Sequence, residues 1–320
     1  MMQPRDVKTA EQARQIIEER GLTHIKVGLF DIDGVMRGKY MSKDKFFSSL
    51  DHGFGFCDVV LGWDSKDQLY DNVNYTGWHT GYPDAPVRII PESCRDLPFE
   101  NNMLLFIAEF SDQAAEVCPR NLLKQVIQRA HKMGFDAFAA LEYEFFVFQE
   151  TPHSAREKGF RNLVPLSPDW FGYSVLRNSV HSDLYQQILE MAEKMDFPIE
   201  GIHTETGPGV LEAAIAVDRA EKAADKAALF KTFMKVLAER NGLMATFMAK
   251  WSNDYPGQSG HIHISLTHRD SAESAFYDPA QPHGMSLIQQ QFLAGQQRLM
   301  PEFLSLIAPT VNSYSRLVPG

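Results

Sequence analysis

The chain has 320 residues, of which 44% are hydrophobic and 22% charged, and its formal net charge is −10. This length is enough for a large core and more than one domain, and the composition is that of an ordinary globular protein. The acidic balance argues against a nucleic-acid partner, which needs clustered lysines and arginines, and the lack of an apolar run of about 18 residues argues against a membrane span.

The first elements in chain order predict a helix and a hairpin. The helix covers Thr9–Arg20 and ends at Gly21. Strand Ile25–Asp31 then turns at Asp33-Gly34 into strand Val35–Tyr40.

The next segment, Asp51–Pro86, is rich in Gly, Asp, Tyr and Trp and shows only weak periodicity. We interpret it as a long irregular segment, and segments of this length are uncommon unless they are functional. Strand Leu104–Phe110 follows. We therefore expect a small α+β domain over residues 1–117 and a second domain over residues 118–320.

The second domain alternates between helices and strands. A helix over Asn121–Met133, stopped by Gly134, leads into a strong strand at Ala137–Phe148. The later predicted elements are helix Ser182–Met195, two strands within Ile202–Ala216 around Gly207-Pro208-Gly209, helix Asp218–Arg240, strands Met244–Lys250 and His261–Leu266, and helix Met285–Leu299, open to extension beyond Pro301.

Two carboxylates lie two residues apart in the predicted strand Ala137–Phe148. Because strand side chains alternate, Glu142 and Glu144 point to the same face. Like charges there are costly unless a cation or hydrogen bonds compensate. The alternative is a strand face exposed to solvent. However, Phe146 and Phe148 continue the same face, which argues against full exposure of that face.

Two other groups of polar residues can likewise be interpreted either as a ligand site or as a polar face exposed to water. Glu205 and Glu212 flank the Gly-Pro-Gly turn, which can bring both carboxylates to one point or leave them on the surface of a hairpin. His261, His263 and Ser265 share one face of a predicted strand, as ligands or as a polar face in water. The cysteine pair that would complete a zinc site is absent from the sequence.

Together these residues favour magnesium or manganese over zinc or copper, because the ligands are mainly carboxylate oxygens. Such ions near ATP neutralise developing phosphoryl charge. The sequence has no GxxxxGK[ST] motif, so a P-loop enzyme is disfavoured. Cys57, Cys94 and Cys118 are far apart, and residues 1–12 have no signal-peptide core, so we expect reduced thiols in a cytoplasmic protein.

Six segments, in order from residue 31 to residue 320, resemble motifs of the glutamine synthetase family. They are Asp31–Lys39 (D-x-x-G-x-x-R-G-K), Glu142–Phe146 (E-x-E-F-F), Glu205–Glu212 (E-x-x-P-G-x-x-E), Thr246–Lys250 (T-F-M-x-K), His261–Leu266 (H-x-H-x-S-L) and Asn312–Gly320 (N-S-Y-x-R-L-V-P-G). The resemblance implies an α+β fold: an N-terminal β-grasp-like domain, then a catalytic domain with a curved antiparallel sheet and flanking helices.

The resemblance also implies a metal-binding role for several residues. The first metal would be held by Glu144, Glu205 and Glu212. The second metal, beside the ATP phosphates, would be held by Glu142 and His261.

The remaining roles concern the substrates. By the same resemblance, His263 and Ser265 line the nucleotide, and Gly257 lies beside the amino-acid substrate. Arg316 pairs with the substrate α-carboxylate, which its planar fork suits. Asp58 matches the aspartate that binds and deprotonates ammonium across a subunit boundary.

The chain departs from the family pattern in places. Val59 and Val60 replace two serines after the aspartate, and Pro256–Gly260 replaces N-G-S-G-M. These less polar surroundings favour an amine or polyamine acceptor over ammonium. Family members continue past this Val-Pro-Gly with a flap glutamate, phosphate-binding arginines and a last metal carboxylate. We therefore expect a catalytic domain without its C-terminal portion, and by itself a poor catalyst.

The resemblance implies an ATP-dependent ligase that joins the γ-carboxylate of glutamate, or of a glutamate-like acid, to ammonia or a small amine through an acyl phosphate. It also implies a ring-shaped homo-oligomer, a decamer or dodecamer. Two alternatives stay open: a catalytically incomplete relative that serves as a scaffold or nucleotide-binding regulator, and a metal-dependent hydrolase built on the same carboxylates.

Overall fold

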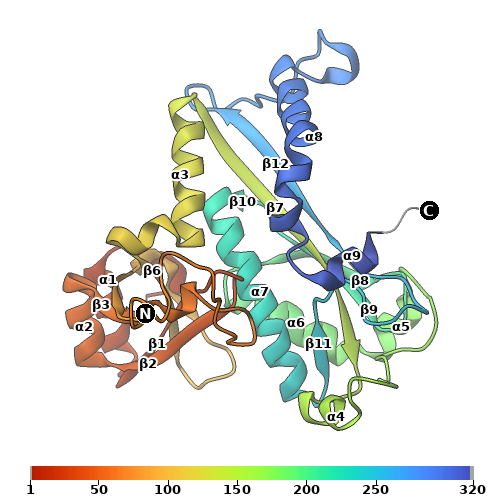
Figure 1. The fold of residues 1–320 in the computed structure, drawn as a ribbon, viewed down its shortest axis with the longest axis horizontal. Coiled ribbons are helices and arrows are strands. Elements are labelled where there is room, and N and C mark those ends of the chain that lie inside the picture. The colour runs from red at the N-terminus through yellow and green to blue at the C-terminus, as the bar shows by residue number, and fades with distance from the viewer. Residues whose placement is uncertain (1, 318–320) are drawn as a thin grey trace. The chain divides into compact units, whose positions relative to one another are not determined.

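The computed structural model describes residues 2–317, which form two compact units (Figure 1). Unit 1 runs to Gln128 and includes Glu190–Phe197, and unit 2 contains Arg129–Leu189 and the chain from Pro198 on. Two of the three divisions fall inside helices α3 (Pro119–Lys132) and α6 (Ser182–Lys194), and the third follows Phe197. The expected domain boundary after residue 117 lies just before α3 and stays a prediction.

Unit 1 contains a mixed sheet in the order β2-β1-β6-β4-β3, with β5 paired to β6. The β1–β6 pair is parallel and the other pairs are antiparallel. The elements are α1 (Ala10–Glu19), β1 (His24–Phe30), β2 (Met36–Ser42), α2 (Lys43–His52), β3 (Phe54–Cys57), β4 (Asp84–Ile89), β5 (Arg95–Asp96) and β6 (Leu104–Phe110).

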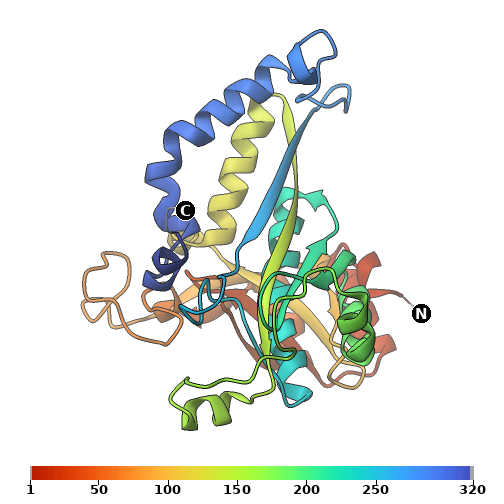
Figure 2. The same cartoon turned by 90° about the vertical axis from the view of Figure 1, so that its right-hand side faces the viewer.

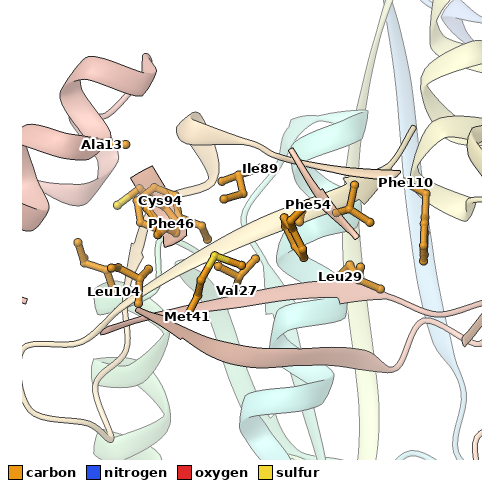
Figure 3. Packing of buried hydrophobic residues seen from close by; sticks show 14 of the residues in the cluster. Ala13, Val27, Leu29, Met41, Phe46, Phe54, Ile89, Cys94, Leu104 and Phe110 are labelled. Atoms are coloured by element: carbon orange, nitrogen blue, oxygen red, sulfur yellow. The ribbon is translucent and has the colours of Figure 1, made fainter. Parts of the chain in front are cut away.

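The core of unit 1 lies between this sheet and its helices (Figure 3). Every residue of β6 is buried, and Phe46 of α2 packs on Phe106 with ring centroids 4.8 Å apart. Cys57, Cys94 and Cys118 are free thiols, as expected, and burial raises the pKa of Cys94 to about 12.

The helix and hairpin predicted near the N-terminus are confirmed. Thr9 and Gln12 form a capping box at the start of α1, which satisfies backbone donors that the helix itself leaves open. The predicted irregular segment Asp51–Pro86 is wrong at both ends, where α2 finishes and β3 pairs with β4. Strand β3 has only four residues, too few for its period to show in the sequence.

Unit 2 is built on one long strand, β7 (Phe135–Phe148), with antiparallel neighbours on both edges (Figures 1 and 2). Strands β9 (Val210–Ile215) and β10 (Asp218–Arg219) follow one edge, β11 (Met244–Thr246) and β12 (Gly260–His268) follow the other, and β8 (Ile199–Thr204) pairs with β9. The helices assigned wholly to unit 2 are α4 (Pro152–Glu157), α5 (Val175–Val180), α7 (Ala220–Arg240), α8 (Leu287–Ile307) and α9 (Val311–Arg316). The expected antiparallel sheet with flanking helices is confirmed.

The two faces of β7 differ. Tyr143 and Phe145 pack on Phe230 of α7, with ring centroids 5.9 and 5.8 Å apart. Phe247 lies 5.3 Å from Phe145, also between ring centroids. Burial raises the pKa of Tyr143 to about 12. Since strand side chains alternate, the even-numbered residues of β7 point to the face away from this aromatic cluster.

Two strand and helix predictions in unit 2 need correction. Asp218–Arg219 forms β10 against β7 instead of the first turn of the helix. The predicted strand Met244–Lys250 ends at Thr246, because Gln258 binds the next three carbonyls in place of a strand partner. Helix α8 does continue past Pro301. Within residues 2–317, none of the helices combines the length and apolar character that crossing a bilayer needs.

A buried carboxylate in unit 1 ties α3 to the sheet. Glu109 of β6 is 1% exposed and accepts hydrogen bonds from Arg88 Nε and Lys124 Nζ, each at 2.7 Å, and also pairs with Arg120. Burial alone raises the pKa of Glu109, but the Lys124 hydrogen bond and the charges of Arg120, Lys124 and Arg88 outweigh it, so the pKa lies below its usual range.

The Glu109→Gln variant should lower the free energy of unfolding by about 3 kcal/mol at neutral pH, because partly buried cations lose their partner. Breaking a buried ion pair costs about 3–5 kcal/mol, and the half-exposed Arg88 keeps this loss near the low end. A carboxylate with a lowered folded pKa stabilises above its unfolded pKa, and that contribution disappears as pH falls through the folded value. Chemical denaturation should therefore show the difference shrinking in acid. Glu116→Gln, an exposed change nearby, is the control; an equal loss there would contradict the assignment.

Candidate metal and substrate site

The register of unit 2 brings the predicted carboxylates to one face of the sheet. Glu144 of β7 pairs with Glu212 of β9, and Glu212 pairs with His203 of β8. Glu142 pairs with His261 of β12. Paired residues and residues two apart in a strand point to the same side. These five side chains therefore share the face opposite the aromatic cluster.

Two groups of possible ligand atoms converge on this face. Glu142, Glu212 and His261 each offer an atom, and these atoms lie within 4.8 Å of one another. His203, Glu205 and Glu212 form a second such group. His261 Nδ1 lies 3.2 Å from Glu142 Oε2. Because Glu212 belongs to both groups, it would contribute to cation binding by either one.

The electrostatics of Glu212 fit a cation site. Burial raises the pKa of this carboxyl group, His203 opposes the shift, and the charges of Glu144, Glu142 and Glu205 add to it. The ionised form is thus disfavoured there, and a divalent cation would reverse that preference. Carboxylate oxygens with an imidazole suit Mg²⁺ or Mn²⁺, so the residues present fit the metals that the resemblance implies.

Glu144 is held by a residue that sequence reasoning did not single out for this contact. The Ser259 backbone N–H donates to Glu144 Oε2 at 3.1 Å, and Ser259 Oγ donates to Oε1 at 3.2 Å. The Glu144 N–H in turn donates to the Ser259 carbonyl at 3.2 Å. Among residues 2–317, Glu144 joins neither ligand group, although it lies beside Glu212 across the strands.

The residues expected to line the nucleotide follow His261 along β12. His263 and Ser265 pair with Ala140 and Phe138 of β7, so they lie on the same face as Glu142. His263 Nε2 is 3.1 Å from Glu142 Oε2. Both side chains are exposed, which leaves their polar atoms accessible to a ligand.

The two residues expected to bind the acid also lie together. A Cβ atom on Gly257 would collide with Arg316 Cδ, so glycine is what lets the Arg316 side chain pass. Helix α9, which carries Arg316, is fixed by Asn312: Lys250 N–H donates to Asn312 Oδ1 at 2.8 Å, and Asn312 Nδ2 donates to the Lys250 carbonyl at 2.5 Å. The final residues of the Asn312–Gly320 motif, 318–320, lie outside the described residues.

Asp58 belongs to unit 1, at the start of the segment that follows β3. It is 4% exposed, and its Oδ1 accepts a hydrogen bond from Thr76 Oγ1 at 2.6 Å. Burial raises the pKa of Asp58, and the Thr76 hydrogen bond opposes the shift. A cavity of about 570 Å³ lies beside it, lined also by Tyr75, His79 and Pro86.

Sequence reasoning missed His203 and Tyr173. His203 precedes Glu205 by two residues, the same alternation that singled out Glu142 and Glu144, so the signal was present in the sequence. Tyr173 stacks on His203 with ring centroids 4.3 Å apart. That contact joins a loop to a distant strand, and no local period announces it.

Residues 116–320 match the family model described as glutamine synthetase, catalytic domain. The chain is 46% identical over 299 residues to type-1 glutamine synthetase 2 of Dictyostelium discoideum, an alignment that covers 92% of this chain and 57% of that protein. It is 33% identical over 322 residues to glutamate–isopropylamine ligase of a Pseudomonas species, covering 98% and 69%. The chain thus spans a little over half to about two thirds of these relatives.

A solved structure shares the fold. The ligand-free structure of GmaS superposes with a TM-score of 0.80 at 24% sequence identity, covering 95% of this chain and 68% of that one.

The Glu212→Gln variant should weaken Mn²⁺ binding by at least about 10-fold, because Glu212 contributes to both ligand groups. The metal-free variant should unfold at the same temperature as the unmodified protein or higher, since one of several repelling charges is gone. Calorimetric titration and thermal unfolding with and without Mn²⁺ measure both effects. Glu239→Gln, an exposed change on α7, is the matched control. Unchanged Mn²⁺ affinity in Glu212→Gln would reject the metal site.

Proposed function

Because the chain belongs to the glutamine synthetase family, we propose that the protein is an ATP-dependent carbon–nitrogen ligase. It joins the γ-carboxylate of glutamate, or of a glutamate-like acid, to an amine through an acyl phosphate. The observation that carries the proposal is the convergence of Glu142, Glu212 and His261, with Glu205 and His203, on one face of the sheet.

The cation ligands in this proposal are Glu142 and His261 for one ion, and Glu144, Glu205 and Glu212 for the other. Bound Mg²⁺ or Mn²⁺ would neutralise charge on the transferring phosphoryl group and on the leaving ADP. A free carboxylate is a poor acyl donor, since its charge repels nucleophiles and oxide is a very poor leaving group. Phosphorylation by ATP supplies the better leaving group.

The chain's own residues orient the reactants. Arg316 holds the α-carboxylate of the acid through its planar fork, and Gly257 leaves room for that arm. His263 and Ser265 contact the nucleotide. An oxygen of the γ-carboxylate attacks the γ-phosphorus of ATP and ADP leaves; the amine nitrogen then attacks the acyl carbon and inorganic phosphate leaves. Fixing both reactants in one geometry lowers the barrier to each step.

Asp58 binds the acceptor and takes its proton, which frees the nitrogen lone pair for attack. A buried carboxylate attracts an ammonium group, and its raised pKa brings it nearer to the pKa that proton transfer needs. The adjoining cavity, of about 570 Å³, has room for an acceptor larger than ammonium. The space beside Asp58 and the apolar neighbours Val59 and Val60 support a small primary amine or polyamine as the acceptor. The relative named glutamate–isopropylamine ligase is, by its name, an enzyme that uses such an amine. Ammonia is the alternative, in line with the name of the Dictyostelium relative.

We also propose a ring-shaped homo-oligomer, a decamer or dodecamer, in which the segment carrying Asp58 reaches the sheet of the adjacent subunit. The irregular stretch after Asp58 carries Trp78, whose 80% exposure is unusual for so large an aromatic residue. An exposed aromatic side chain on a long segment suits a subunit contact, and a ring closes such a head-to-tail interface.

The ligase proposal predicts ATP-dependent product formation with glutamate, Mn²⁺ and an amine. The protein expressed from its complete reading frame is tested against a panel of primary amines, polyamines and ammonia, with phosphate release and amide product both measured. A primary amine or polyamine should give the highest kcat/KM. Asp58→Asn and Arg316→Lys should each lower it by about 10²–10³-fold. Ammonia as the best acceptor would reject the amine assignment, and nucleotide binding without any product would favour the regulator alternative.

The oligomer proposal predicts complementation between two inactive variants. When Asp58→Asn and Arg316→Lys subunits are co-expressed, some sites receive an intact Asp58 from one subunit and an intact Arg316 from its neighbour, so partial activity should return. Light scattering of the same sample should give the mass of a ring. If mixed subunits stay inactive while each variant still assembles, the site lies within one subunit and the shared-site proposal fails.

A further inference from the structure

The short segment Gly257–Ser259 touches both arms of the site in unit 2. Ser259 donates two hydrogen bonds to Glu144, and Gly257 lies against Arg316. Gln258 lies between them and is 5% exposed. We propose that Gln258 is a positioning residue that fixes the cation arm and the acid arm relative to each other; this rests on the proposed function, which supplies the roles of Glu144 and Arg316.

Gln258 is bound to one stretch of backbone by three hydrogen bonds. Its side-chain Nε2 donates to the Phe247 carbonyl at 2.6 Å and to the Met248 carbonyl at 2.8 Å. Its backbone N–H donates to the Ala249 carbonyl at 2.8 Å. These carbonyls directly follow β11, so the amide replaces the strand partner that they lose there. The glutamine that serves them is itself buried, so its amide is held in place by these bonds.

The cation arm begins one residue later. Ser259 contacts both oxygens of Glu144, and the Glu144 N–H donates back to the Ser259 carbonyl. A ligating carboxylate whose outer hydrogen bonds are fixed is already oriented for a cation. A shift of Gln258 would move Ser259 and therefore reorient Glu144.

The acid arm begins one residue earlier. The Ala249 carbonyl that binds Gln258 also lies close to the Cα of Gly257, where a Cβ atom would be 2.5 Å away. The next residue, Lys250, holds Asn312 of α9 by two hydrogen bonds, and α9 carries Arg316. The same backbone stretch thus sets the position of Gly257 and of the helix that presents Arg316.

The identities of Gln258 and Ser259, as well as their positions, determine these contacts. The family motif N-G-S-G-M has serine where this chain has Gln258, and glycine where it has Ser259. A serine hydroxyl has one donor, whereas a glutamine amide has two, which here serve two carbonyls. The glycine has no side chain to reach Glu144. The Gln258 amide bonds and the Ser259 Oγ bond are therefore products of this chain's own residues, whereas the Ser259 N–H bond is one that glycine would also make.

The test separates the two arms with three variants. Gln258→Met keeps the length of the side chain but removes both amide donors, so it should raise the Mn²⁺ dissociation constant of the acid-free protein by about 10-fold or more and raise KM for the acid similarly. Ser259→Ala should raise only the Mn²⁺ constant, and Asn312→Ala only KM for the acid. Calorimetry with Mn²⁺ alone, steady-state kinetics and thermal unfolding provide the readouts.

Gln297→Met, the same substitution at an exposed position of α8, is the control and should change neither value. If the protein binds Mn²⁺ and makes product while Gln258→Met changes neither value or only one, the inference is overturned and the ligase proposal stands. If the unmodified protein binds neither Mn²⁺ nor acid, both fail. If Gln258→Met does not fold, the other two variants decide, because equal effects of Ser259→Ala and Asn312→Ala on both values would also overturn the inference.

Discussion

The alternation of side chains along β7 is the constraint on which the site depends. Odd-numbered residues such as Tyr143 and Phe145 are packed against α7, and even-numbered ones such as Glu142 and Glu144 face the opposite side. A slip of one residue would bury the carboxylates and expose the rings. Burial of the aromatic cluster therefore supplies the free energy that keeps like charges side by side, and partners along both edges hold the register.

This arrangement leaves electrostatic repulsion between the neighbouring carboxylates. Their hydrogen-bond and charge partners offset that repulsion to different extents. Ser259 gives Glu144 two hydrogen bonds, whereas Glu212 has His203 near it, with Nε2 and Oε2 3.6 Å apart, and otherwise faces further carboxylates. Glu212, whose pKa burial and the neighbouring carboxylates raise, is the carboxylate that both ligand groups share. A demand for a cation thus falls where the most possible ligands meet.

Local patterns predicted the parts of this structure that depend on local physics. The period of two along β7 and the turn before Glu212 placed the carboxylates, and the helical pattern stopped by Gly21 placed the first helix. Strand β10 escaped prediction because its two residues are strand only by pairing with β7. The contact between Ser259 and Glu144 joins residues 115 positions apart. The sequence hinted at it only through the departure of Pro256–Gly260 from the family motif. Tertiary contacts of this kind override propensity and carry no local period.

The turn between β8 and β9 has a consequence for how such proteins diverge. Gly209 adopts φ +67°, and a Cβ atom there would lie 2.5 Å from the Val147 carbonyl, so the turn lies directly against β7 at this point. An inserted or deleted residue between Glu205 and Glu212 would change which strand faces meet and scatter the ligands. Lineages built on this hairpin can vary by substitution here, while changes in chain length accumulate in the loops outside it.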